Sequence, residues 1–146
     1  MRLSYSCTEI VKSVDEIQHP LVREALQLTG LGNDRLHIYS MGDVPAGTGL
    51  GLSSSFLVGL LKALWAYKGV YKSVRELAEQ ACYIEIEILG DPVGTQDQYA
   101  AAFGGLNWIR FYPDESVEVE PVACSPAPWH TPARTACVRG RGGAAA

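Results

Sequence analysis

The sequence lacks the features that mark a membrane, secreted or nucleic-acid-binding protein. Its apolar runs fall well short of the roughly 20 residues of a transmembrane helix. The first residues, MRLSYSCTEIV, do not form the apolar segment of a signal peptide. Only 12 basic residues stand against 16 acidic ones, which disfavours binding to phosphate backbones through Lys and Arg. We therefore expect a cytoplasmic protein that binds neither membranes nor nucleic acids.

Cysteine is scarce, and its spacing disfavours a zinc site. The four cysteines are Cys7, Cys82, Cys124 and Cys137, and no two have the CxxC spacing of zinc ligands. Without a secretory signal, free thiols are the expected state. Apolar residues nevertheless make up 47% of the 146-residue chain and charged residues 19%, which is the composition of a globular domain. A chain of this length can bury a core without disulfides.

The charge is distributed unevenly along the chain. All 16 acidic residues lie within residues 1–120, whereas residues 121–146 contain three Arg and four of the eight Pro. The last 26 residues show neither helical nor strand periodicity. We therefore expect a folded domain over residues 1–120 and an irregular tail over residues 121–146 that is not part of the fold. A shifted reading frame would produce such a tail, a hypothesis that only the gene sequence can test.

The periodicity of the first 120 residues predicts alternating helices and strands. Helices are expected over residues 20–28, 53–67, 73–89 and 94–103. The third of these opens with the capping-box pattern Ser73-Val-Arg-Glu76. Strands are expected over residues 3–6 and 36–41, and a hairpin over residues 106–112 and 117–120.

The strongest local signal is the segment PAGTGLGLSSS, residues 45–55, in which three alternating glycines are followed by three serines that open a helix. Glycines let backbone N–H groups approach a ligand closely, and the first N–H groups of a helix lack partners within it. The segment is therefore suited to hold a phosphate. It matches neither GxxxxGK[ST] nor GxGxxG. The alternative is a glycine-rich turn before an ordinary serine-capped helix, which accounts for one serine but not for three.

Acidic residues form a second group at the end of the predicted helix over residues 73–89 and just beyond it. Glu85 and Glu87 lie near the end of that helix, and Asp97 follows in the stretch GDPVGTQDQ. Carboxylates and serine hydroxyls are hard oxygen ligands that suit Mg²⁺, and phosphoryl transfer needs a metal and a group that orients the attacking hydroxyl. The alternatives are two surface glutamates on different helix faces and an Asp97 that caps a helix or turn.

The segment PAGTGLGLSSS resembles the second motif of the GHMP kinases, commonly P-x-G-x-G-L-G-S-S. GDPVGTQDQYAAAFGGLN resembles the sugar-kinase branch of that family. The likeness extends from about Ser4 to Cys124. It implies an α+β fold like the N-terminal lobe of these kinases, related to the ribosomal S5 domain 2-like fold. It also implies transfer of the γ-phosphate of ATP, with Mg²⁺, to a sugar hydroxyl, and a heptose 7-phosphate is the expected small-molecule acceptor.

The resemblance also implies a role for each matching residue. Asp97 would be the catalytic base or orienting group for the sugar hydroxyl, and Ser53 and Glu85 would be the Mg²⁺ ligands. The nucleotide would be held by the loop and the helix start, that is by Gly47, Thr48, Gly49, Leu50, Gly51, Ser53, Ser54 and Ser55.

Two departures from the family pattern qualify these expectations. Leu52 stands where the family has a serine, which removes one hydroxyl beside the phosphates. The family's first and third motifs do not occur in the sequence, so the fold is expected to be a truncated lobe. The alternative function is therefore a non-catalytic remnant that binds nucleotide weakly or acts only as a folded interaction module. The sequence does not indicate an oligomeric state.

Overall fold

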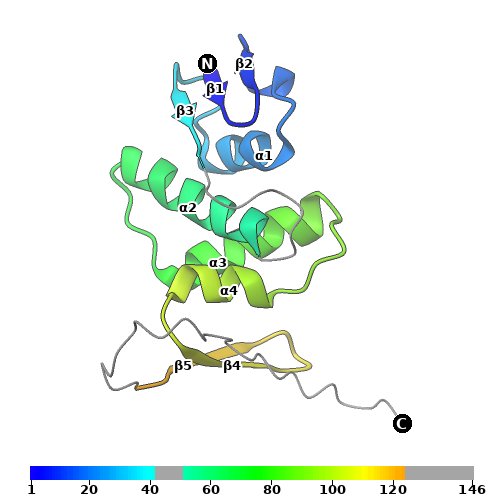
Figure 1. Ribbon diagram of the computed structural model, residues 1–146, viewed down its shortest axis with the longest axis vertical. Coiled ribbons are helices and arrows are strands. Elements are labelled where there is room, and N and C mark those ends of the chain that lie inside the picture. Colours follow the sequence, from blue (N-terminus) through cyan, green and yellow to red (C-terminus); the bar gives the residue numbers. More distant parts are fainter. Residues whose placement is uncertain (42–50, 124–146) are drawn as a thin grey trace.

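The computed structural model describes residues 1–41 and 51–123 (Figure 1). A small sheet and helix α1 lie at one end of the molecule. Helix α2 crosses the middle, helices α3 and α4 pack against it, and a β-hairpin lies at the opposite end. Helices and strands thus mix as the α+β expectation requires. Residues 42–50, and with them the glycines at 47 and 49, lie outside the described part.

The sheet has three short strands. The central strand β1 (Arg2–Ser4) pairs antiparallel with β2 (Thr8–Ile10) and parallel with β3 (His37–Tyr39). The expected strands at residues 3–6 and 36–41 correspond to β1 and β3. Strand β2 was not expected, because three residues are too few to show an alternating pattern.

Helix α1 (Pro20–Thr29) connects the sheet to the rest of the core and follows the short 3₁₀ helix η1 (Val14–Glu16). Pro20 occupies the first turn, where a missing N–H costs nothing. Gly30 ends the helix in the left-handed region with a φ of 70°. Lys68 Nζ donates a 2.6 Å hydrogen bond to the carbonyl of Thr29, which places a cation at the negative end of the helix.

Helix α2 (Leu52–Tyr67) begins one residue before its expected start and ends where the pattern predicts. Helix α3 (Val74–Cys82) begins with the expected capping box at Ser73. The pattern predicts one helix to about residue 89, but the α-helical hydrogen bonding ends at Cys82. A π-helical segment, η2 (Tyr83–Ile88), continues it with bonds such as Leu89 N–H to the carbonyl of Ile84. The sequence pattern does not distinguish these two helix types here, because both bury one face and the π-helical segment has only six residues.

Helix α4 (Gln96–Phe103) leads into the predicted hairpin of β4 (Asn107–Phe111) and β5 (Val117–Pro121). Strand β5 extends one residue beyond the expected domain boundary at 120. The expected tail otherwise lies almost entirely outside the described residues, and its irregularity stays a prediction.

The core lies where α1, α2 and α3 meet under the sheet. Its fully or almost fully buried members include Leu3, Ile17, Ala25, Leu26, Leu57, Leu61, Leu77, Ala81 and Ile84. None of the helices in residues 1–41 and 51–123 combines the length and apolar character needed to cross a membrane. Cys7 and Cys82 are free thiols, as expected, and the other two cysteines lie outside the described part.

Candidate functional site

The start of α2 presents its three serines to three different surroundings. Gly51 precedes the helix in the left-handed region with a φ of 68°. Ser53 is exposed, and Ser54 is buried. Ser55 is exposed and lines a separate cleft. The helix start therefore offers one hydroxyl to the interior and two to the surface.

The buried hydroxyl belongs to a polar cluster drawn from three elements. Ser54 on α2 donates a 2.8 Å hydrogen bond to Oε2 of Glu85 on η2. Gln98 on α4 donates from Nε2 to the same oxygen. All three side chains are at most 2% exposed. Residues separated by 13 and 31 positions in sequence thus meet at one carboxylate, which we call the Glu85 cluster.

Burial makes the Glu85 carboxylate energetically costly. An ionised carboxylate withdrawn from water needs charged or hydrogen-bonding partners to offset its desolvation. Within the described residues, Ser54 and Gln98 both donate their hydrogen bonds to Oε2 of Glu85. No side chain or backbone N–H of these residues donates to its Oε1. No Lys or Arg of the described part pairs with Glu85. The carboxylate thus keeps one oxygen for a further partner, such as a cation.

The π-helical segment provides the local setting of Glu85. Leu89 N–H bonds to the carbonyl of Ile84, five residues back, at 3.0 Å, and Asp91 N–H bonds to the carbonyl of Glu85 at 2.9 Å. These bonds widen the turn and alter the direction of the side chains that it carries. Such π-helical turns occur frequently at functional sites. Glu87, two residues on, is exposed, so the surface alternative applies to Glu87 but not to Glu85.

Asp97 lies against the start of α2. A Cβ atom built on Gly51 would lie 3.2 Å from Asp97 Cγ and 3.2 Å from its Oδ2. Only glycine allows this approach without displacing the carboxylate. Asp97 also lies in the first turn of α4, where a negative charge is favourable. The structure therefore brings the half-buried Asp97 beside the N-terminal end of α2, next to the Glu85 cluster through its neighbour Gln98.

Residues 12–105 match the family model for the GHMP kinases N terminal domain. This segment is more than half of the chain and contains Ser53, Glu85 and Asp97. The chain belongs to the GHMP kinase family. The resemblance of the two sequence motifs is thereby confirmed.

Individual GHMP kinases show how far the likeness extends. The chain is 47% identical over 87 residues to D-glycero-alpha-D-manno-heptose 7-phosphate kinase of Campylobacter jejuni, over 60% of this chain and 25% of that protein. It is 31% identical over 100 residues to galactokinase of Pyrococcus furiosus, over 68% of this chain and 27% of that enzyme.

A solved structure confirms the fold. The crystal structure of D-glycero-D-manno-heptose 1-phosphate kinase from Bacteroides thetaiotaomicron superposes with a TM-score of 0.77 at 30% identity, covering 85% of this chain and 44% of that chain. The mixed α+β lobe expected from the resemblance is therefore present. The chain spans from about a quarter to less than half of the length of these three relatives.

The residues expected to bind Mg²⁺ are chemically suited to it. The exposed Ser53 hydroxyl and Oε1 of Glu85, which has no donor among the described residues, are hard oxygen ligands. Within the described residues, no three His, Cys, Asp or Glu side chains form a group that could hold a metal by themselves. Mg²⁺ is commonly held by one or two protein oxygens together with substrate phosphates and water, so a small donor set fits it.

The site residues predicted from the sequence did not include Gln98. Asp97 was the candidate in this stretch of the sequence, because a lone glutamine carries no strong signal for a functional site. A usable signal was present nevertheless. Ala78, Ala81 and Glu85 share one helical face at spacings of three and four residues, which predicts that Glu85 points inward. A buried glutamate requires donors, and the polar residues of nearby helices are the candidates for them.

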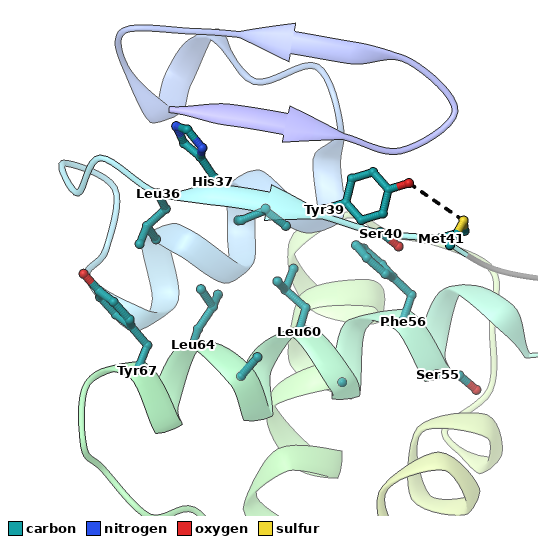
Figure 2. A pocket seen from close by; sticks show the side chains of 13 residues that line it. Leu36, His37, Tyr39, Ser40, Met41, Ser55, Phe56, Leu60, Leu64 and Tyr67 are labelled. Atoms are coloured by element: carbon teal, nitrogen blue, oxygen red, sulfur yellow. Dashed lines mark hydrogen bonds between the residues drawn. The ribbon is translucent and has the colours of Figure 1, made fainter.

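An apolar cleft lies on another side of α2 (Figure 2). This cleft of about 520 Å³ runs between strand β3 and the helix. Its lining is largely apolar, with Met41, Phe56, Leu60 and Tyr67 among its side chains. Of the residues predicted to hold nucleotide, only Ser55 lines it within the described part. The cleft is therefore distinct from the Glu85 cluster.

Proposed function

We propose that this chain is the nucleotide-binding lobe of a sugar kinase that transfers the γ-phosphate of Mg·ATP to a hydroxyl of a heptose phosphate. Its relatives are kinases of heptose phosphates and of galactose. The two heptose kinases differ in the position of the phosphate in their names. The higher identity is with the 7-phosphate kinase, which favours a heptose 7-phosphate as the acceptor.

One observation carries the proposal. Side chains from three separate elements converge at the N-terminal end of α2, where backbone N–H groups and the helix dipole favour a phosphate. The sequence predicts that the preceding glycines at 47, 49 and 51, with Thr48 and Leu50, wrap the phosphates of ATP. Ser54 does not reach the surface, so we assign it to Glu85 and leave Ser53 and Ser55 as candidate hydroxyls for the nucleotide.

Ser53 and Glu85 would hold Mg²⁺ together with the nucleotide, and the metal would neutralise charge that develops on the transferred phosphate. Glu85 would contribute a carboxylate that its two donors hold in place. The exposed Ser53 hydroxyl contributes a neutral oxygen. These two residues stay proposed ligands.

Asp97 is the proposed acceptor of the proton of the attacking sugar hydroxyl. Phosphoryl transfer is achieved largely by positioning, so the group that orients this hydroxyl must lie beside the phosphate site. The carboxylate of Asp97 lies against Gly51, the residue that precedes α2. This is the location that the role requires.

The test is ADP release by the intact 146-residue chain in the presence of Mg·ATP and D-glycero-D-manno-heptose 7-phosphate. Activity in the wild type and a loss of about 10²–10⁴ in kcat for Asp97→Asn are expected. Asp91→Asn, which changes an exposed acid in the preceding loop, is the matched control and should retain activity.

Two results would count against parts of this proposal. Binding of Mg·ATP without phosphate transfer to any heptose phosphate would favour the non-catalytic remnant. Full activity of Asp97→Asn would remove Asp97 from the proposed role while leaving the kinase activity intact.

A further inference from the structure

The orientation of the Gln98 amide is fixed by its partner. An ionised carboxylate only accepts hydrogen bonds, so the nitrogen of the amide must face Glu85. Nε2 of Gln98 accordingly donates to Glu85 Oε2. The carbonyl end of the amide, Oε1, must then point away from the carboxylate.

That carbonyl oxygen is buried and has no partner among the described residues. Gln98 is 0% exposed, so its Oε1 cannot be satisfied by bulk water in this conformation. A buried acceptor left without a donor costs about 1–3 kcal/mol. Native proteins rarely keep such an atom, and when they do, an ion, a bound water or a ligand commonly supplies the partner.

The buried acceptor and the free carboxylate oxygen belong to the same small cluster. Ser54 and Gln98 both bind Oε2 of Glu85 and leave its Oε1 without a described donor. A hydrated divalent cation supplies both missing partners, because the metal binds a carboxylate oxygen while its water molecules donate to a carbonyl. No cation from a Lys or Arg side chain in the described part competes for this place.

We propose that Ser54 and Gln98 are positioning residues for the metal of Mg·ATP. They hold Oε2 of Glu85 so that Oε1 is left for the cation, and the carbonyl of Gln98 would accept a hydrogen bond from a water molecule bound to that cation. This inference rests on the proposed nucleotide-binding function. It adds two residues that act through Glu85 and the cation's water rather than on the phosphate itself.

The test is the dissociation constant of ATP, measured by titration calorimetry on the intact chain, once in Mg²⁺ and once in EDTA. The ratio of the dissociation constant in EDTA to the dissociation constant in Mg²⁺ isolates the contribution of the metal. A purely structural change weakens both measurements alike and leaves the ratio unaltered. Gln98→Met keeps a similar volume but removes both hydrogen-bonding groups, and Ser54→Ala removes one hydroxyl. Gln96→Met is the matched control, because Gln96 is exposed on the same helix turn.

The expected result is a ratio that falls at least tenfold in Gln98→Met and Ser54→Ala, with ATP affinity in EDTA unchanged, and that keeps its wild-type value in Gln96→Met. Wild-type ratios in folded Gln98→Met and Ser54→Ala would overturn the positioning role and leave the proposed function standing. If Gln98→Met does not fold, the milder Ser54→Ala decides alone. Absence of metal-dependent ATP binding in the wild type would overturn the proposed function as well.

Discussion

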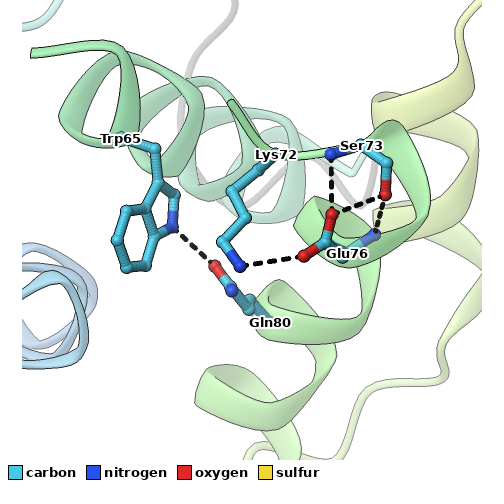
Figure 3. Close-up of polar contacts among 5 residues, drawn as sticks. All are labelled: Trp65, Lys72, Ser73, Glu76 and Gln80. Atoms are coloured by element: carbon cyan, nitrogen blue, oxygen red, sulfur yellow. Dashed lines mark hydrogen bonds and ion pairs between the residues drawn. The ribbon is translucent and has the colours of Figure 1, made fainter. Parts of the chain in front are cut away.

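Two serine–glutamate pairs in this chain use the same chemical groups in opposite surroundings. Ser54 and Glu85 meet in the interior and come from elements 31 residues apart in sequence. Ser73 and Glu76 meet at the start of α3, three residues apart, at the surface (Figure 3). The first pair needs the whole fold to form, whereas the second needs only one turn of helix.

The surface pair is well supplied with donors. Glu76 accepts from Lys72 Nζ at 2.8 Å and from the N–H and hydroxyl of Ser73 at 2.9 Å each. These contacts, the Lys72 ammonium first, lower the pKa of Glu76 to about 2. Trp65 lies beside them and donates to Gln80 at 2.8 Å (Figure 3). Every group has a local partner, so the cluster needs no ligand to explain it.

The Glu85 cluster differs because its partners are incomplete. The carboxylate has no charged partner among the described residues, and the Gln98 carbonyl has no donor there. A protein that needed only stability would fill this space with apolar side chains. The comparison therefore separates a polar cluster whose partners are all local from one that lacks partners within the described residues.

The largest expected effect comes from removing both donors of Glu85. The double variant Ser54→Ala with Gln98→Met leaves a buried carboxylate without partners, which should lower the free energy of unfolding by about 3–5 kcal/mol. Urea denaturation measures the change. Adding Glu85→Met should restore most of the loss, because the unpaired charge is then gone. A double variant within about 0.5 kcal/mol of the wild type would show that the carboxylate is not held as described.

Next in size is the effect of a Cβ atom at the start of α2. Gly51 and Gly69 have φ values of 68° and 71°, so alanine at either position should cost about 1–2 kcal/mol in the left-handed region. Only the Cβ at 51 would approach Asp97, since nothing lies within 4 Å at 69. Thermal unfolding should therefore show the larger loss for Gly51→Ala. Equal losses would contradict the close approach of Asp97 to Gly51.

A smaller effect is expected at the surface pair. Ser73→Ala removes the side-chain cap of α3 and should lower the free energy of unfolding by about 1 kcal/mol, measured by urea denaturation. The metal-dependent ratio of ATP affinities should stay at its wild-type value, because this pair belongs to no proposed site. A change in that ratio would blur the distinction between the two clusters.

The smallest effect concerns pH. Ionised Glu76 has a pKa of about 2 in the fold against an ordinary value of 4.5, so its stabilising contribution is present above about pH 4.5 and is lost as the pH falls toward 2. Chemical denaturation of wild type and Glu76→Gln at several pH values should show a stability difference that shrinks over this interval. A difference independent of pH would show that the charge of Glu76 does not contribute.

Local patterns predicted the parts of the fold that depend on neighbours in sequence. The capping box at Ser73, the stop of α1 at Gly30 and the hairpin of β4 and β5 each follow from residues a few positions apart. The π-helical turn at η2 was not predictable from the same information, because a six-residue segment is too short for its apolar pattern to distinguish a π helix from an α helix.

The residues of the candidate site likewise fall into two groups, those that the sequence predicts and those that depend on contacts between distant elements. The chemistry of the acidic residues singled out Glu85 and Asp97, the family resemblance gave them roles, and the structure places them at one end of α2. Gln98 and the inward direction of Ser54 depend on contacts between α2, η2 and α4, which no short window of sequence contains. The proposed roles of Gly47, Thr48, Gly49 and Leu50 fall outside the described residues and stay predictions.

The most direct test of the account is the thermal unfolding of wild type and Glu85→Met, each with Mg·ATP, with Mg²⁺ alone and with neither. A ligand at a hundredfold excess over its Kd adds about 2.7 kcal/mol to the stability of the native state. We predict that Mg·ATP raises the Tm of the wild type, that Mg²⁺ alone does not, and that Glu85→Met shows no rise. A wild-type Tm that ignores Mg·ATP, or an equal rise in Glu85→Met, would contradict the assignment of the Glu85 cluster to the nucleotide site.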